Sequence, residues 1–159
     1  YNFIFHATNI NKELISSYFS KEKIPNIEII YDDKIKTEVL KKSIFAVVKS
    51  GTVSLEVCKM NVPSIIFYKM NFINFYLAKF LLNIKFANMI NIINNREVIP
   101  ELIQSECNAD EIFKSVYYFL KKPDLIAKQK EEVKKTLESL TSPSSSSEEA
   151  SNIILSYIS

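Results

Sequence analysis

Short apolar runs dominate the first 70 residues of the chain, and longer periodic stretches dominate the rest. Four runs rich in β-branched and aromatic residues predict strands over 3–7, 27–31, 44–48 and 64–68. The segments between them mix polar and apolar residues and predict helices over about 10–20, 33–42 and 53–60. Strands that alternate with helices in this way imply a parallel sheet with right-handed crossovers. We therefore expect an α/β fold, a Rossmann-like parallel sheet with flanking helices.

The pattern beyond residue 70 is different. It predicts an apolar helix over 72–83, a polar loop over 88–95, and helices over 97–104, 109–120 and 124–139. A serine-rich linker follows, and the pattern Ser146-x-x-Glu149 is typical of a capping box that begins a last helix to about 158. We expect a domain over 1–140, a linker over 141–147 and a C-terminal helix over 148–159.

Composition excludes some classes of protein. The 159 residues are 47% hydrophobic and 24% charged, which is ordinary for a globular domain. Twenty basic against 18 acidic residues leave a net charge of +2, so we expect no nucleic-acid partner. Cys58 and Cys107 form no metal-binding or disulfide pattern and predict reduced thiols. The lone His6, in an apolar run, predicts a strand-end residue without chemistry.

The single glycine marks the first candidate site. Gly51 lies between a predicted strand and a predicted helix, where its free backbone permits a close approach of a ligand. Unpaired N–H groups at the start of a helix bind phosphate, and the hydroxyls of Ser50 and Thr52 can add hydrogen bonds. Glu56, one turn further on, could accept hydrogen bonds from a ribose diol. The alternative is an ordinary turn in which Thr52 caps the helix and Glu56 is solvated.

The single arginine marks the second candidate site. Arg96 stands among amides and acids in the stretch 91–104, and its side chain suits planar recognition with several donors. Asn and Gln side chains offer donors and acceptors for sugar hydroxyls or a uracil edge. The alternative is a loop in which Arg96 pairs with Glu97 or Glu101.

The two sites occur together with further motifs in a fixed order. These are Ser50-Gly51-Thr52-x-x-x-Glu56, then Pro63-Ser64-Ile65-Ile66-Phe67-Tyr68-Lys69, then Asn91, then Arg96-Glu97-Val98-x-Pro100-Glu101-Leu102-x-Gln104. This succession, over most of residues 1–138, resembles the C-terminal half of the lipid-A-disaccharide synthase family. The resemblance implies the nucleotide-sugar-binding domain of a GT-B glycosyltransferase.

The resemblance also implies roles for single residues. Ser50, Gly51 and Thr52 would hold the diphosphate of the UDP-sugar donor, and Glu56 its ribose. Asn91 falls on the active-site asparagine of the family. Further donor-side positions fall on Arg96, Glu97 and Gln104. The chain departs from the family pattern at Ile90, where the family has Pro, and at Asn94 and Asn95, where it has Ala-Gly.

The activity implied is transfer of 2,3-diacylglucosamine from UDP to the lipid acceptor 2,3-diacylglucosamine 1-phosphate, in lipid A biosynthesis. The family's N-terminal half, with the acceptor site and the catalytic carboxylate, would be the partner of this chain, which alone we expect to be inactive. We expect no metal and no cofactor, and a bacterial cytoplasmic location, peripheral on the cytoplasmic face of the inner membrane. The alternative is a non-catalytic nucleotide-sugar-binding module or another GT-B relative, such as the undecaprenyl-linked N-acetylglucosaminyltransferase or a UDP-sugar epimerase.

The apolar segment over 72–83 raises the question of a membrane contact. At about 1.5 Å rise per residue it is too short to span a hydrocarbon core of about 30 Å. It is either a helix buried in the protein or an interfacial helix. In the second case we expect the membrane surface to contact Phe72, Phe75, Tyr76, Phe80 and Lys79.

Overall fold

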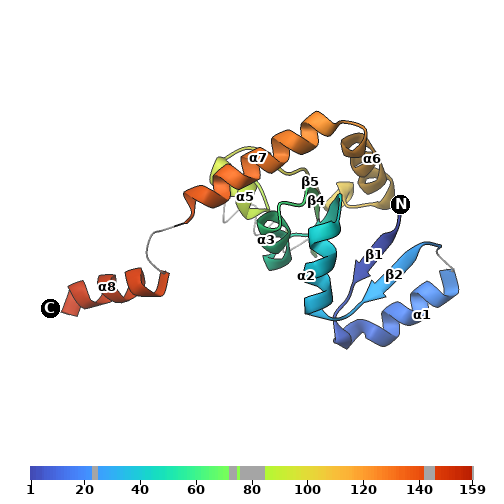
Figure 1. Cartoon of the computed structure of the whole chain (residues 1–159), viewed down its shortest axis with the longest axis horizontal. Coiled ribbons are helices and arrows are strands. Elements are labelled where there is room, and N and C mark those ends of the chain that lie inside the picture. The colour runs from blue at the N-terminus through green and yellow to red at the C-terminus, as the bar shows by residue number, and fades with distance from the viewer. Residues whose placement is uncertain (23–24, 72–74, 76–84, 142–145, 159) are drawn as a thin grey trace. The chain divides into compact units, whose positions relative to one another are not determined.

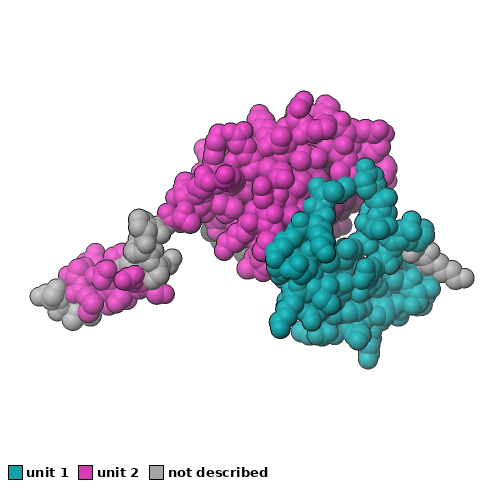
Figure 2. Space-filling model, in the orientation of Figure 1, with its two compact units in different colours: residues 1–44 teal, residues 45–159 magenta. Residues whose placement is uncertain are grey.

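The computed structural model describes the chain apart from residues 23–24, 72–74, 76–84, 142–145 and 159. The chain forms two compact units, residues 1–44 and residues 45–159 (Figure 2). Each unit contains a parallel sheet of its own, with two strands in the first and three in the second. Parallel strands flanked by helices, in an open α/β arrangement, are the class that the sequence predicts.

The first unit is a β-α-β-α segment. Its elements are β1 (Phe3–His6), the 3₁₀ helix η1 (Asn9–Asn11), α1 (Lys12–Glu22), β2 (Ile27–Ile30) and α2 (Asp33–Lys42). β1 and β2 pair in parallel, with Phe3 opposite Ile27. Asp32 caps α2, because its carboxylate accepts a 2.6 Å hydrogen bond from the Lys34 amide. His6 ends β1, as the sequence predicts, and its Nε2 lies 3.5 Å from an Asp33 oxygen.

The second unit is built on strands β3 (Ala46–Lys49), β4 (Ser64–Tyr68) and β5 (Glu101–Ile103), in the order β3-β4-β5. The register places Lys49 opposite Phe67 and Tyr68 opposite Ile103, so the three strands end at one edge of the sheet. The central strand supplies the middle of the core, with Ile65 and Ile66 fully buried. Burial of apolar side chains around β4 is the main stabilising contribution here.

Helices α3 (Thr52–Lys59), α5 (Met89–Asn94), α6 (Ala109–Leu120) and α7 (Pro123–Ser139) accompany this sheet, with the 3₁₀ helix η2 (Gln104–Glu106) after β5. α7 packs against α3, α5 and α6 (Figure 1). One side of α7 buries Gln129, Val133 and Thr136, which recur at helical spacing. Gln129 accepts from the Ser64 amide at 2.8 Å and donates to the Ser64 carbonyl at 2.9 Å, so its buried amide is satisfied.

Most predicted elements agree with the structure, and α2, β4 and α6 have the predicted bounds. A last helix, α8 (Ser146–Ile158), begins at the capping-box serine. The predicted helix over 72–83 lies outside the described residues, except for Phe75. No helix formed by the described part of the chain has both the length and the apolar character that crossing a membrane requires.

Two predictions between residues 88 and 104 are wrong. The expected polar loop over 88–95 contains helix α5. Asn88 caps this helix, because its side chain accepts a 2.9 Å hydrogen bond from the Ile90 amide, and Asn95 ends the helix in left-handed geometry, with φ of 48°. The expected helix over 97–104 is strand β5 followed by η2. Pairing with β4 outweighs the helical pattern of this short segment.

Candidate functional site

The candidate residues nearest the carboxyl edge of the β3-β4-β5 sheet follow strands β3 and β5. Ser50, Gly51 and Thr52 come directly after β3, and Gln104 comes directly after β5. Both strands flank β4, so the two groups are separated by about two strand spacings, or about 10 Å. This edge is where open parallel sheets bind ligands.

Gly51 has a backbone conformation that few other residues adopt. Its φ is 140°, and a Cβ added there would meet no heavy atom within 4 Å. The position therefore needs glycine for its backbone angle, not for lack of room. The open space above the turn lets a ligand approach the peptide groups closely.

Helix α3 begins at Thr52, immediately after this turn. The amides of Thr52 and Val53 belong to the first turn of the helix, where N–H groups have no partner within the helix. Thr52 is exposed and Glu56 is half-buried, and their spacing of four residues places them on the same face. The opposite face of α3 buries Ser54, Val57 and Cys58.

The Ser50 hydroxyl is already engaged. It donates a 2.7 Å hydrogen bond to the Ala87 carbonyl, and the Ser50 amide donates to the Phe67 carbonyl at 3.1 Å. A hydroxyl has one proton to donate. A hydrogen bond from Ser50 to a phosphate oxygen, as the sequence predicts, requires the bond to Ala87 to be exchanged.

Asn91 lies in the core, on α5, with none of its surface exposed. Its Nδ2 donates to the Ile99 carbonyl and to Glu101 Oε1, both at 2.7 Å. Its Oδ1 accepts from the amides of Val98 at 2.8 Å and Ile99 at 2.9 Å. All four hydrogen-bonding positions of the amide are used, so in this conformation Asn91 holds the segment 98–101 and does not face solvent.

The structure brings Asn91 together with buried Glu101, which the sequence suggested as a partner of Arg96, and with Asn88 and Ser54, for which the sequence predicted no role. Glu101 accepts from the amides of Ala87 at 2.7 Å and Asn88 at 2.9 Å as well as from Asn91. The Asn88 side chain donates to Ser54 Oγ at 3.0 Å. Sequence signals existed, since Glu101 stands in the motif around Arg96 and Asn88 precedes an apolar run as an N-cap does.

Arg96 pairs with neither of the acids expected from the sequence. Its guanidinium lies 2.8 Å from Glu132 on α7, while Glu97 accepts a 3.3 Å bond from the Glu101 amide. The two partners Arg96 and Glu132 have 52% and 21% of their side chains exposed. Glu97 and Glu101 already accept hydrogen bonds from local backbone amides, and α7 brings the Glu132 carboxylate within reach of Arg96.

Gln104 extends the β4–β5 pairing with its side chain. Its Oε1 accepts from the Met70 amide at 2.9 Å, and its Nε2 donates to the Met70 carbonyl at 3.2 Å. This pattern imitates a strand neighbour beyond the end of β5. Gln104 therefore fixes the chain where it leaves β4, and one proton of its amide group stays available for a ligand.

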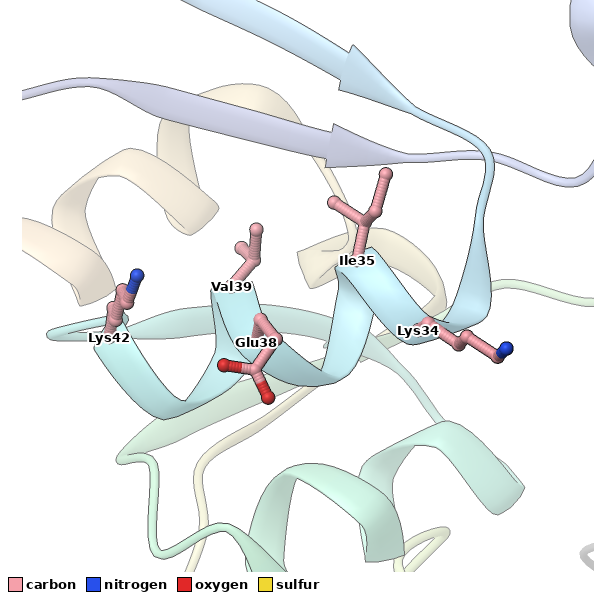
Figure 3. Close-up of a pocket in the computed structure, with 5 residues that line it drawn as sticks. All are labelled: Lys34, Ile35, Glu38, Val39 and Lys42. Carbon is pink, nitrogen blue, oxygen red and sulfur yellow. The ribbon is translucent and has the colours of Figure 1, made fainter.

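Other features of the described residues carry no site. A shallow hollow on α2, in the first unit, is lined by Lys34, Ile35, Glu38, Val39 and Lys42 (Figure 3). It contains none of the candidate residues. Burial raises the pKa of the Cys58 thiol to about 11, as expected of an inert core thiol. Among the described residues no three His, Cys, Asp or Glu side chains are grouped as metal ligands would be.

Comparison with known proteins assigns the chain to a family. Residues 2–155 match the family model described as lipid-A-disaccharide synthetase. The lipid-A-disaccharide synthase of Rickettsia bellii (strain OSU 85-389) is 36% identical over 137 residues, 86% of this chain and 35% of the relative. That of Persephonella marina (strain DSM 14350 / EX-H1) is 30% identical over 141 residues, 87% of this chain and 37% of the relative. The chain thus spans about a third of the length of the curated relatives it matches, and it belongs to the lipid-A-disaccharide synthetase family.

Proposed function

We propose that this chain is the donor-binding half of a glycosyltransferase that transfers 2,3-diacylglucosamine from UDP to 2,3-diacylglucosamine 1-phosphate, forming lipid A disaccharide and UDP. The observation that carries the proposal is the family match over nearly the whole chain, with the family's glycine turn lying open at the end of β3. Family membership favours this function over a non-catalytic module or another GT-B relative.

The donor diphosphate binds at Gly51 and Thr52. Cleavage of the glycosidic bond leaves negative charge on UDP, and fixed donors directed at that charge lower the barrier. The first amides of α3, the Thr52 hydroxyl and the positive end of the helix dipole provide this stabilisation. Ser50 shapes the turn through its bond to Ala87, and the half-buried Glu56 receives the ribose hydroxyls.

Three donor-side residues complete the proposed site. Gln104 offers its remaining amide proton at the carboxyl edge, and the exposed side chains of Arg96 and Glu97 are assigned to the uracil or the sugar by their positions in the family motif. Asn91 acts on the reaction by holding the segment that carries these residues. This assigns Asn91 a positioning role and leaves direct contact with the sugar to side chains that face solvent.

The proposed enzyme also needs an N-terminal half and a membrane-binding segment. An N-terminal half supplies the acceptor site and the catalytic carboxylate. Attachment to the inner membrane surface involves Phe72, Phe75, Tyr76, Phe80 and Lys79. Flotation of the complete protein with anionic vesicles, compared with its Phe75→Ser and Phe80→Ser variants, tests that attachment. Equal vesicle binding by variants that fold normally would make this segment part of the core.

Titration of the ¹⁵N-labelled chain with UDP tests the binding site directly. We expect UDP to shift the amide resonances of Gly51, Thr52 and Val53, and UMP to bind more weakly than UDP. In Gly51→Val we expect these shifts and the preference for UDP to be lost. Lys59→Ala, at the exposed end of α3, is the matched control. Shifts confined to other regions, or unchanged affinity in Gly51→Val, would overturn the site.

A test of the activity uses the complete protein. Glu56→Ala should raise the KM for the UDP-sugar with little change in kcat, because a ribose contact contributes to ground-state and transition-state binding alike. An unchanged KM would remove Glu56 from the site.

A further inference from the structure

We propose that Glu101 is a positioning residue, whose buried carboxylate fixes the segment 87–91 against the Gly51 turn and so sets the geometry of the phosphate-binding amides. That the ligand is UDP rests on the proposed function, whereas the coupling between residues 87–91 and the Gly51 turn does not. Glu101 begins β5, and the Gly51 turn follows β3, two strands away. The two have no direct contact among the hydrogen bonds described, so the effect passes through residues 87 and 88.

The first step is the set of hydrogen bonds by which Glu101 holds the segment 87–91. Its Oε2 accepts from the Ala87 amide at 2.7 Å, and its Oε1 accepts from the Asn88 amide at 2.9 Å and from Asn91 Nδ2 at 2.7 Å. Three donors from consecutive and neighbouring positions thus meet one acceptor-only group. An ionised carboxylate satisfies all three, whereas an amide or a hydroxyl cannot.

The second step consists of two links from the segment to the glycine turn. Ser50 donates to the Ala87 carbonyl at 2.7 Å. Asn88 donates to Ser54 Oγ at 3.0 Å, and Ser54 Oγ donates to the Gly51 carbonyl at 2.6 Å. Both residues whose amides Glu101 holds are therefore tied to the turn, Ala87 through its carbonyl and Asn88 through its side chain.

Burial makes these links stiff. Ser54, Asn88, Asn91 and Glu101 are exposed by 2%, 1%, 0% and 9%. In such surroundings no water replaces a broken hydrogen bond, and leaving a donor unpaired costs more than the bond contributes when made. The bonds to the Ala87 and Gly51 carbonyls are part-buried, so the buried hydrogen bonds of Asn88 provide the stiffest connection between the segment and the turn.

Glu101→Gln tests the coupling selectively. Oε1 receives two of the three hydrogen bonds, so the glutamine oxygen is best placed there, and the new NH₂ group then faces the Ala87 amide. Two donors then meet at Ala87, the residue whose carbonyl accepts from Ser50, so the disturbance reaches the turn through this residue. Glu106→Gln, on the exposed part of η2, is the matched control.

Amide spectra of the chain without ligand give the first result. We expect Glu101→Gln to shift the resonances of Ser50, Gly51 and Thr52, and Glu106→Gln to leave them in place. Shifts confined to residues 87–101 would overturn the coupling. If Glu101→Gln does not fold, Ser50→Ala tests the coupling from the side of the turn. Unchanged Ala87 and Asn88 resonances in Ser50→Ala would overturn the coupling equally.

UDP affinity gives the second result. Ser50→Ala and Glu101→Gln should each raise the Kd for UDP by up to about tenfold, the size of one net hydrogen bond. The double variant should bind no more weakly than the weaker single variant, because both changes break one path. A Kd of the double variant raised by the product of the two single effects, or an unchanged Kd in Glu101→Gln, would contradict the proposal. If the parent chain does not bind UDP, the proposed function fails and the amide spectra alone decide the coupling.

Discussion

The Gly51 turn and the segment 87–104 contain similar polar residues but use them in opposite ways. At the turn, Thr52 is exposed and the space beside Gly51 is open. In the segment, Asn88, Asn91 and Glu101 are buried and spend their hydrogen bonds on the protein itself. A polar side chain is free to bind a ligand only where folding has left its donors and acceptors unused.

The difference suggests a division of labour. In the proposed site the open turn contacts the ligand, and the buried segment holds the parts around it in place. Substitutions in the two regions should differ in kind, since loss of a contact residue changes affinity and loss of a buried polar residue changes stability as well.

The largest expected effect is on stability, from Asn91→Ala. The substitution leaves the Val98 and Ile99 amides without acceptors in the core, at about 1–3 kcal/mol each, so the free energy of unfolding should fall by about 3 kcal/mol or more. Urea unfolding followed by circular dichroism measures the change, with exposed Asn152→Ala as the control. Unchanged stability with turnover of the complete protein lowered about 10²-fold would instead show a direct catalytic contact.

Gly51→Ala is expected to weaken ligand binding as well as to lower stability. No clash arises, but the φ of 140° is strained for alanine, so we expect a loss of about 1–3 kcal/mol of unfolding free energy together with weaker UDP binding. Urea unfolding and UDP titration of the same sample separate the two effects. Full UDP affinity in this variant would mean that the backbone angle is unimportant to the site.

A small effect on stability is expected from the ion pair between Arg96 and Glu132. Its partners are partly exposed, so solvent screens the attraction, and a double-mutant cycle of Arg96→Ala and Glu132→Ala should give a coupling below about 1 kcal/mol. Circular dichroism and activity of the complete protein, measured together on Arg96→Ala, then separate its roles. Lost activity with an intact fold supports a donor contact, and loss of both makes Arg96 structural.

The smallest effect concerns the two thiols, which report how accessible each region is. Burial raises the pKa of Cys58, behind the open turn, to about 11, while Cys107 is half-buried after η2. At pH 8 a thiol reagent should modify Cys107 in the folded chain and both thiols in urea, as counted by mass spectrometry. Since the folded pKa of Cys58 is raised, its contribution to stability is lost as the pH rises toward 11. Rapid labelling of Cys58 at pH 8 would show that α3 opens.

The fold was predictable where local signals and long-range packing agree. The β4 run and the α2 and α6 patterns gave the correct bounds because each has a clear period and clear ends. β5 was missed because its three residues carry too little pattern to distinguish a strand from a helical turn, and its identity depends on pairing with β4. α5 was missed because its asparagines are typical of a loop until their hydrogen-bond partners are known.

The candidate site divides in the same way. The sequence by itself determined that Gly51 lies in a strand-to-helix turn, since a lone glycine between an apolar run and a helical pattern is typical of such a turn. It also determined the family, through motifs in a fixed order. Only the tertiary structure decided that Ser50 bonds to Ala87, that Arg96 pairs with Glu132, and that Asn91 is buried against Glu101. The physical reason is that residue type sets which hydrogen bonds a side chain can make, whereas partners brought in from distant parts of the chain decide which it does make.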